Sequence, residues 1–300
     1  MHFVVTGGAG FVGSHLVKLL VEEGHEITVI DNLHKGKKEN LASVINKIKF
    51  QKIDIRDCES MRKVLKNIDG VFHQAALTVV QDSFSRPEEY FDVNVRGTEN
   101  IFKLAIENKF KVVYASSSSV YGHKLETPIA EDTERNPINP YGKTKLETEH
   151  LVEKYSKLNA EIIGLRYFNV FGTGQTLDYA GVITKFLDRI RVGKAPIIFG
   201  KGSQIRDFVH VNDVARANLL AMESNSSNLI VNIGTGNAIS ILDLANMIIS
   251  TSGLKTNPIF AEALKGDIEK SHADISQAKK HFNWEPKIEL QDWLMEILKK

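Results

Sequence analysis

The stretch TGGAGFVG (residues 6–13) follows an apolar run typical of a β-strand, residues 3–7, and opens an amphipathic run typical of a helix, residues 10–24. Its three glycines are spaced GxxGxxG: Gly7, Gly10 and Gly13. Glycines in this arrangement allow a tight turn, close approach of the backbone to a pyrophosphate, and close packing of the helix on the strand. The start of a helix also offers unpaired amides and partial positive charge to an anion. The stretch therefore predicts a phosphate-binding turn; the alternative is a glycine turn that serves only packing.

The same alternation of short apolar and longer amphipathic runs continues outward from this turn. Further strands are predicted at residues 26–31, within 48–57, at 68–76 and at 111–119, and further helices up to about residue 66, at 88–108 and at 141–158, before the apolar segment 160–172. Strands that alternate with helices form βαβ units and a parallel sheet with helices on both faces. We therefore expect an α/β protein with a Rossmann-like doubly wound parallel sheet, which binds ligands at the carboxyl ends of its strands.

The composition of the chain changes after about residue 170, where glycine-rich loops become frequent. Helices are predicted around residues 181–193, 211–223 and 240–252. We expect two domains: residues 1–168 form the dinucleotide-binding Rossmann domain, and residues 169–300 form mainly a smaller, mixed substrate-binding domain, with some segments that return to the sheet.

The bulk composition argues against several classes of function. The chain has 300 residues, 42% of them hydrophobic, and a net charge of +1, which gives no attraction to nucleic acid or to an anionic membrane. No apolar run is long enough to span a membrane, and no signal peptide is expected. The single cysteine, Cys58, excludes an intramolecular disulfide and fits a reducing compartment, so we expect a cytoplasmic protein. The ten histidines are scattered, and no metal site is predicted.

Two aspartates follow predicted strands at the ligand-binding edge of the sheet. Asp31 ends the second strand, 18 residues after Gly13 (31 − 13). An acid at this place accepts hydrogen bonds from the adenosine ribose of a dinucleotide, and it repels a 2′-phosphate, so NAD is expected rather than NADP. Asp54 follows the third strand and is placed to reach the adenine amine; a plain turn aspartate is the alternative.

A tyrosine and a lysine lie four residues apart in NPYGKTK (139–145). Tyr141 and Lys145 would face the same side of a helix, because four residues make about one turn. We expect the ammonium to lower the pKa of the phenol, because a cation favours the phenolate. A phenol that loses its proton near neutral pH can act as a general base. The alternative is a capped helix with a surface tyrosine.

Taken together, these motifs resemble those of the extended short-chain dehydrogenase/reductases, in the NAD-dependent sugar-nucleotide epimerase/dehydratase family. The resemblance covers essentially the whole chain, and its most similar members are the UDP-hexose 4-epimerases. The segments that carry it, besides the glycine turn and PYGKTK, are HQAALTVV (73–80), NVRGT (94–98), SSSSVYG (116–122), RYFNVFG (166–172), RDFVHVND (206–213), and a GD followed by an AD near 266–274.

The resemblance implies a catalytic set of Ser117, Tyr141 and Lys145. Tyr141 would remove the proton from the sugar 4-hydroxyl, Ser117 would orient that hydroxyl, and Lys145 would also bind the nicotinamide ribose. The 4-hydrogen would leave as hydride to NAD, and the 4-keto sugar would rotate before the hydride returns to its other face. His73 is expected to be a packed residue rather than a catalyst.

The cofactor-binding residues predicted from the motifs and the resemblance are Gly7, Gly10, Phe11, Val12, Gly13, Asp31, Asn32, Asp54, Ile55, Ala75, Asn94, Tyr141 and Lys145. Asn94 in this set is expected to support the cofactor site and the helix geometry around it.

On the substrate side, the resemblance adds Asn169, Arg206 and Asp267 to Ser117 and Tyr141. Arg206 would bind the two phosphates of a UDP-sugar, because a guanidinium is a planar fork of donors. A structural ion pair between Arg206 and Asp207 is the alternative. The family usually has a second arginine three residues before the aspartate that Asp267 matches, and here that position is Leu264. Lys265 is a candidate replacement, as a point charge.

Ser271, four residues after Asp267, matches a position that acts as a size gate beside the sugar 2-substituent. A bulky tyrosine there restricts similar enzymes to plain hexoses, whereas a small residue leaves room for an N-acetyl group. We therefore expect UDP-GlcNAc and UDP-GalNAc to be accepted alongside UDP-Glc and UDP-Gal.

Three other functions fit the same scaffold. A 4,6-dehydratase needs an acid just before VYG, where this chain has Ser118 and Ser119, so dehydration is disfavoured. A uronate epimerase or decarboxylase stays open, because its carboxylate recognition would depend on loops. A non-catalytic NAD sensor would not need the catalytic set, which is present. The resemblance also implies a homodimer formed by the two long helices.

Overall fold

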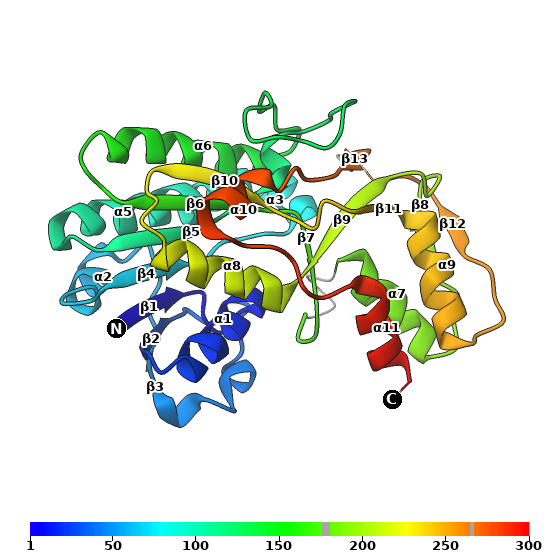
Figure 1. The fold of residues 1–300 in the computed structure, drawn as a ribbon, viewed down its shortest axis with the longest axis horizontal. Coiled ribbons are helices and arrows are strands. Elements are labelled where there is room, and N and C mark those ends of the chain that lie inside the picture. Colours follow the sequence, from blue (N-terminus) through cyan, green and yellow to red (C-terminus); the bar gives the residue numbers. More distant parts are fainter. Residues whose placement is uncertain (176–180, 265–266, 300) are drawn as a thin grey trace.

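The computed structural model describes residues 1–175, 181–264 and 267–299. Its main element is a seven-stranded parallel sheet in the order β3-β2-β1-β4-β5-β6-β10 (Figure 1). The strands are β1 (His2–Thr6), β2 (Glu26–Ile30), β3 (Ile48–Gln51), β4 (Gly70–His73), β5 (Lys111–Ser117), β6 (Ile162–Tyr167) and β10 (Leu229–Ile233). The order of connection reverses between β1 and β4, and a doubly wound sheet binds ligands at such a point. The expected α/β class and Rossmann-like sheet are confirmed.

Both faces of this sheet are buried, because side chains that alternate along each strand enter two separate hydrophobic cores. Phe3 and Val5 of β1 join one core, and Val4 between them joins the other. The helices α1 (Phe11–Glu22) and α8 (Val211–Glu223) cover the first face, together with α10 (Ser276–Phe282). The second face is covered by α2 (Cys58–Val64), α5 (Gly97–Asn108) and α6 (Pro140–Ser156).

The prediction of one continuous helix over residues 88–108 is wrong in detail. The segment consists of α4 (Pro87–Phe91), a π-helical turn η3 (Asp92–Arg96) and α5. The short helix α3 (Val80–Ser85) precedes it. Asn94 in the π-helical turn is 1% exposed, and its amide group bonds the backbone of Leu77 and the hydroxyl of Thr144. This buried side chain gives a physical reason for the interruption, and π-helical turns are frequent at functional sites.

The segment 160–172 also divides into two strands. β6 ends at Tyr167 in the large sheet, and β7 (Asn169–Phe171) pairs instead with β9 (Ile205–His210) in a second, mixed sheet. That sheet also contains β11 (Ala238–Ser240) and β13 (Lys270–Ser271), and a separate pair is formed by β8 (Ile197–Phe199) and β12 (Ile259–Ala261). The helices α7 (Val182–Arg191), α9 (Ile241–Ser252) and α11 (Leu290–Leu298) pack there around a third core.

The second half of the chain contributes to both parts of the molecule. β10 and α8 return to the large sheet, while the second sheet and its helices form the right-hand part of Figure 1. The domain boundary at residue 168 stays a prediction. The remaining short helical turns are η1 (Lys38–Leu41), η2 (Ile45–Lys47) and η4 (Ser118–Val120).

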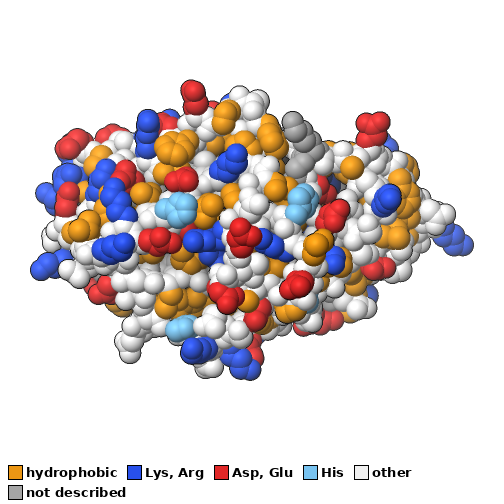
Figure 2. Space-filling view, turned by 90° about the horizontal axis from the view of Figure 1, so that it is seen from above, with side chains coloured by type: hydrophobic (Ala, Val, Ile, Leu, Met, Phe, Trp, Pro, Cys, Tyr) orange, Lys and Arg blue, Asp and Glu red, His pale blue; other side chains and the backbone are white. Residues whose placement is uncertain are grey.

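The surface carries charges of both signs. On the face shown in Figure 2, acidic and basic side chains alternate with small apolar areas, and neither sign forms a continuous field. This mixture fits the net charge of +1. Within the described ranges, none of the helices combines the length and the apolar character needed to cross a bilayer.

Candidate active site

A cavity of about 360 Å³ opens at the carboxyl ends of the parallel strands. Among the predicted residues, those that line it are Gly7, Gly10, Phe11, Val12, Gly13, Asp31, Asn32, Asp54, Ile55, Ala75, Ser117, Tyr141 and Lys145. Asn94 and the four substrate-side residues Asn169, Arg206, Asp267 and Ser271 do not line this cavity. The fold therefore gathers at one edge residues from six segments: those that follow β1, β2, β3 and β4, the end of β5, and helix α6.

The glycine turn has the geometry of a phosphate cradle. Gly7 has a φ of +67°, and a Cβ there would lie 2.7 Å from the backbone of Ala75, so a side chain is excluded. Helix α1 starts after Gly10 with no side-chain cap and with no acidic residue in its first turn. Its first amides, from Phe11 to Gly13, therefore have no internal acceptor and are available to an anion. The turn fits the pyrophosphate of a dinucleotide.

Asp31 is held in place by two backbone amides. Its carboxylate accepts hydrogen bonds from Ala9 N at 3.0 Å and from Leu33 N at 2.8 Å, and the residue is 7% exposed. Burial raises the pKa of this carboxyl, and the two amides oppose the rise. Each carboxylate oxygen keeps a free lone pair, so a ribose diol can still donate to Asp31.

Asp54 is engaged within the protein. Arg56 donates to it from Nη2 at 2.8 Å and from Nε at 2.9 Å, and Asn32 Nδ2 donates at 3.0 Å. The hydrogen bonds from Arg56 hold the pKa of this carboxyl well below its usual range. Asp54 thus lies in the cavity wall, but it also makes the local contacts expected of a turn aspartate.

Helix α6 brings the tyrosine and the lysine to the end of β5. Asn139 caps the helix by accepting from Gly142 N at 2.8 Å, and Pro140 occupies its first turn. Gly142 packs directly on the turn after β5, where a Cβ would lie 2.7 Å from the carbonyl oxygen of Ser119. This close approach allows a hydrogen bond between Tyr141 and Ser117, the last residue of β5.

Lys145 does not lower the pKa of Tyr141 in this structure, so that expectation is wrong for the protein without its cofactor. Burial raises the phenol pKa, and only the hydrogen bond with Ser117 opposes it. The ammonium lies 5.9 Å from the centre of the tyrosine ring and donates to the carbonyl oxygen of Ala115 at 2.7 Å. Burial also lowers the pKa of Lys145 to about 8, opposed by the charge of Glu149. The loss of solvation therefore exceeds the attraction between the pair.

His73 is a packed residue, as expected. Its ring nitrogens bond the hydroxyls of Thr6 at 2.7 Å and Thr98 at 2.8 Å, and burial lowers its pKa to about 3. Asn94 lies behind the cavity wall, where it fixes Leu77 against α6 through Thr144.

The substrate-side residues gather on the second sheet. Arg206 on β9 donates to Asp267 Oδ1 at 2.5 Å rather than pairing with Asp207, which instead accepts from Thr235, Gly236 and Ala273. Ser271 on β13 is the register partner of Arg206 and is 6% exposed.

Asn169 lies between Phe168 and Val170, which both line the cavity, and its amide donates to the carbonyl of Asp207 at 3.2 Å. Leu264 is 42% exposed, and Lys265 lies outside the described residues.

Several residues of the cavity wall were not among the predicted site residues. Tyr167 donates to Gln74 Oε1 at 3.0 Å, and both line the cavity. Both directly follow or end a parallel strand, so their position could have indicated them. Asn40 lies in the helical turn η1 and Gln175 in an irregular segment, and neither position offers such a signal. No group of three or more His, Cys, Asp or Glu residues that could hold a metal occurs in the part of the chain that the structure describes.

Comparison with known proteins agrees with this geometry. Residues 3–234 match the model of the NAD dependent epimerase/dehydratase family. The chain belongs to this family. A relative from Methanocaldococcus jannaschii, named "Putative UDP-glucose 4-epimerase", is 39% identical, with 98% of this chain and 96% of the relative covered.

Two solved structures of family members are very similar. UDP-glucose 4-epimerase from Thermotoga maritima, solved with UDP-glucose, superposes with a TM-score of 0.95 at 36% identity, covering 100% of this chain and 98% of that one. UDP-N-acetylglucosamine 4-epimerase from Methanobrevibacter ruminantium, in complex with UDP-N-acetylmuramic acid, has a TM-score of 0.94 at 35% identity, covering 99% and 97%.

Family members with other activities also match. A UDP-N-acetyl-alpha-D-glucosaminuronate decarboxylase from Bacillus cytotoxicus is 32% identical, with 98% of this chain and 96% of the relative covered. A dTDP-glucose 4,6-dehydratase from Streptomyces venezuelae, solved with NAD, has a TM-score of 0.94 at 25% identity, covering 100% and 96%. The expected cofactor, NAD, is thus confirmed for the epimerase/dehydratase family, and the family's activities extend beyond epimerisation.

Proposed function

We propose that the protein is an NAD-dependent UDP-hexose 4-epimerase that interconverts UDP-Glc and UDP-Gal, and also UDP-GlcNAc and UDP-GalNAc. The observation that carries the proposal is the position of Ser117, Tyr141 and Lys145 at one end of a cavity whose other end is the glycine turn and Asp31. Such an arrangement can bring a hydroxyl-bearing carbon next to a hydride acceptor. The similarity to two solved 4-epimerases supports the same assignment.

The residues that would hold NAD are the amides at the start of α1 for the pyrophosphate and Asp31 for the adenosine ribose. Asp54 would lie toward the adenine and Lys145 toward the nicotinamide ribose. When bound, NAD supplies the acceptor and later the donor of the hydride from carbon 4 of the sugar.

The protein itself would move the proton. Tyr141 as phenolate takes the proton of the 4-hydroxyl, which Ser117 orients through its own hydroxyl. Lys145 as ammonium stabilises that phenolate once the positively charged nicotinamide ring and the substrate have entered. A 4-keto sugar results on the substrate, and Tyr141 returns the proton after the sugar has turned.

The second sheet would bind the nucleotide. Arg206 is 9% exposed, and its guanidinium donates to the carboxylate of Asp267. This ion pair fixes the orientation of the guanidinium, and burial removes most of its water, before the substrate binds. Asn169 lies on β7, which pairs with the strand of Arg206, and its register partner is Phe208. The residues on both sides of Asn169 in the sequence line the cavity. Ser271 is a small register neighbour of Arg206, and its short side chain would leave more room for a 2-acetamido group near the diphosphate than a tyrosine would.

The other family activities fit less well. Dehydration needs an acid where this chain has Ser118 and Ser119, and Ser119 Oγ is buried without a hydrogen-bond partner. Uronate decarboxylation would need a cation at the sugar carboxylate. In the described part of the cavity wall, Lys145 is the basic residue next to Tyr141, and it is already bound to Ala115.

We also propose a homodimer in the cytoplasm. The support for dimerisation is the resemblance, which implies a four-helix bundle of α5 and α6 from two copies. The exposed sides of these helices carry charges such as Lys103 and Glu147, so the dimer should weaken at high salt. Light scattering after size exclusion, at low and high salt, tests this part.

Proton NMR of the purified protein with UDP-Gal and, separately, UDP-GalNAc tests the activity, with NAD present and no reductant. We expect the anomeric signals of both 4-epimers to appear. Conversion of UDP-Gal alone would overturn the role of Ser271, and conversion of neither would overturn the epimerase assignment. Replacing Ser271→Tyr should abolish conversion of UDP-GalNAc while UDP-Gal is still converted.

A further inference from the structure

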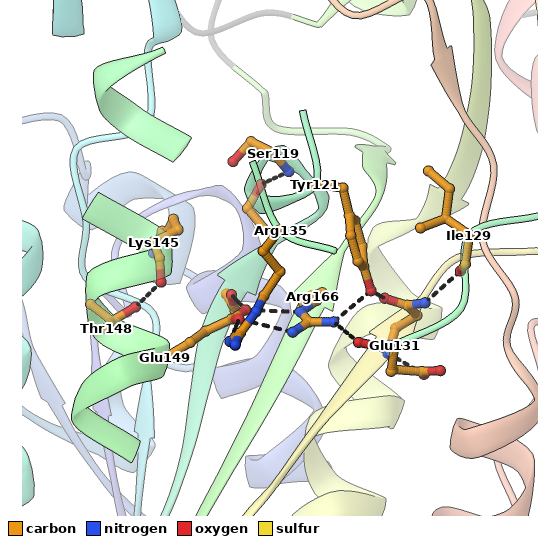
Figure 3. A network of polar contacts seen from close by, with 12 residues as sticks. Ser119, Tyr121, Ile129, Glu131, Arg135, Lys145, Thr148, Glu149 and Arg166 are labelled. Carbon is orange, nitrogen blue, oxygen red and sulfur yellow. Dashed lines mark hydrogen bonds and ion pairs between the residues drawn. The ribbon is translucent and has the colours of Figure 1, made fainter. Parts of the chain in front are cut away.

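Glu149 is a wholly buried carboxylate that the proposed reaction does not use. It lies one helical turn after Lys145 on α6 and is 0% exposed. Ser116 Oγ donates to it at 2.7 Å, and Arg166 donates to it from Nε and Nη2, both at 2.9 Å (Figure 3). Arg135 adds a fourth hydrogen bond at 3.1 Å. The Glu149 carboxylate thus connects four parts of the fold: α6, the end of strand β5, strand β6 and the loop before α6.

The position of Ser116 makes this contact relevant to the active site. Ser116 lines the cavity and directly precedes Ser117, and Ala115 before it accepts the hydrogen bond of Lys145. Glu149 and Lys145 therefore bond two adjacent residues of β5, Ser116 and Ala115, and fix this strand end against the same helix. A movement of this strand end would separate Ser117 from Tyr141.

The cluster also continues toward the second sheet. Arg166 Nη1 donates to the hydroxyl of Tyr121 at 2.6 Å and to the carbonyl of Glu131 at 2.9 Å. Tyr121 in turn donates to Asn232 at 2.7 Å, and Asn232 bonds the backbone of Ile129 and Asp274. Figure 3 shows these groups as one continuous row from α6 to the loop at Ile129.

Stability alone gives a weak reason for such a cluster. Replacing a buried ion pair by apolar side chains of similar volume is often neutral or stabilising, because desolvation offsets the attraction. A buried charge next to a buried lysine has a more specific effect, since it compensates the lysine's loss of solvation.

The groups that face Lys145 from the surrounding elements leave this effect to Glu149. His73 on β4 is neutral, because its pKa is about 3, and Tyr114 on β5 is neutral, because burial raises its pKa well above the ordinary value. Arg166 on β6 and Arg135 both bind Glu149, and Figure 3 shows Arg166 on the side of Glu149 away from Lys145. Glu149 supplies the negative charge.

We propose that Glu149 is a positioning residue for the epimerase reaction: its carboxylate fixes the end of β5 that carries Ser117 against α6 and keeps Lys145 an ammonium. The inference rests on the proposed function, and its test includes a readout that needs neither substrate nor cofactor.

The decisive variant is Glu149→Gln, which keeps the shape of the side chain and an oxygen for Ser116 but removes the charge. Loss of the negative charge favours the neutral amine, so the titration of Lys145 should move to lower pH. NMR of protein labelled with ¹³Cε-lysine follows this titration, with the Lys145 signal assigned by its absence in Lys145→Met. In turnover of UDP-Gal, kcat at about pH 8 should fall at least about tenfold, and the alkaline limb of its pH profile should move to lower pH.

Three variants separate charge from packing. Ser116→Ala removes one hydrogen bond and keeps the charge, so kcat should fall while the Lys145 titration stays. Asp213→Asn removes a different buried carboxylate, which pairs with Arg216 on α8, and should leave the Lys145 titration and the pH profile unchanged. Glu149→Asp restores the charge and should return the titration toward that of the unmodified protein.

Arg135→Gln tests the same claim if Glu149→Gln does not fold, because the Arg135 side chain is 29% exposed and its loss should be tolerated. Removing this positive charge leaves Glu149 less compensated, so the Lys145 titration should move to higher pH. An unchanged titration in whichever of the two variants folds overturns the proposal. Absence of UDP-Gal turnover in the unmodified protein would overturn the proposed function instead, and the lysine titration would still be measured.

Discussion

Two features of its surroundings shift the pKa of Tyr141 in opposite directions. Burial raises its pKa, and the hydrogen bond with Ser117 lowers it. The neighbouring Lys145 donates to the carbonyl oxygen of Ala115. Because its pKa is about 8, a part of the lysine is the neutral amine at a pH near 8. A base role for Tyr141 therefore requires further positive charge, which an oxidised nicotinamide ring would supply when NAD is bound. Tyr141 should be a poor base in the protein without cofactor and a good one with it.

Replacing Tyr141→Phe should lower kcat at least about a hundredfold, because a positioned general base contributes about that much or more. NAD binding, measured by the shift in Tm on adding NAD, should be retained. The matched control is Tyr155→Phe on the same helix, whose hydroxyl donates to Glu99 rather than to the site. Equal turnover by the two variants would show that Tyr141 is not the general base of the reaction.

His73 makes stability depend on pH. Its pKa is about 3 in the folded protein and 6.5 as the ordinary value, so between these two pH values the unfolded chain binds the extra proton. Stability is therefore lost as pH falls through this window, by at most about 1.4 kcal/mol per pH unit from this residue. Urea unfolding of His73→Gln should show a shallower pH slope than the unmodified protein. His150→Gln, at a half-exposed site, should keep the original slope, and identical slopes for all three proteins would contradict the account.

At the scale of elements, the contact between α6 and the turn after β5 sets the geometry of the site. Gly142 allows this contact, since the position of its missing Cβ lies 2.7 Å from the carbonyl oxygen of Ser119. A backbone carbonyl cannot move aside as easily as the end of a flexible side chain. A larger residue at position 142 must therefore displace the helix. Tyr141 precedes Gly142 and would move with it.

Gly142→Ala should therefore lower kcat by about tenfold or more, with a smaller change in KM, because misplaced reacting groups reduce the rate more than the binding. The control is Gly181→Ala, where the nearest atom to the added Cβ among the described residues is Gln175 Oε1 at 3.8 Å. Steady-state kinetics with UDP-Gal measures both. Unchanged kcat in Gly142→Ala would show that the contact does not position the tyrosine.

The elements themselves were largely predictable because strands buried on both faces and amphipathic helices have strong periodic patterns. The helix α8 has the predicted bounds, and α9 differs by one residue. The π-helical turn around Asn94 was not predictable, because it depends on hydrogen bonds to Leu77 and Thr144, which are distant in sequence. The change of sheet at Phe168 was also missed, because the pairing of β7 with β9 depends on residues that are distant in sequence.

At the scale of the whole molecule, the proposed function would draw on two sheets with different tasks. The large sheet carries the cavity with Asp31, Ser117 and Tyr141, and the second sheet would provide Arg206 through β9. The motifs indicated both sets, because each lies at a strand end or in a glycine turn. The ion pair of Arg206 with Asp267, instead of with Asp207, was not predictable, since adjacent residues of a strand point to opposite faces and only the fold brings Asp267 close.

Arg206→Lys should separate these tasks. A lysine keeps the charge but loses the planar fork, so the KM for UDP-Gal should rise about tenfold while kcat changes little. Arg216→Lys, an arginine that pairs with Asp213 away from the cavity, should leave both constants unchanged. A loss confined to kcat would place Arg206 in the chemistry rather than in nucleotide binding.

The most direct measurement of the central claim uses UDP-galactose with deuterium at carbon 4 of the sugar. The protein with NAD, and without any reductant, should form UDP-glucose that keeps the deuterium at carbon 4, because the hydride that leaves this carbon is the one that returns. Proton and deuterium NMR of the product detect this. A product with protium at carbon 4, or no UDP-glucose at all, would contradict 4-epimerisation by transfer and return of hydride at this site.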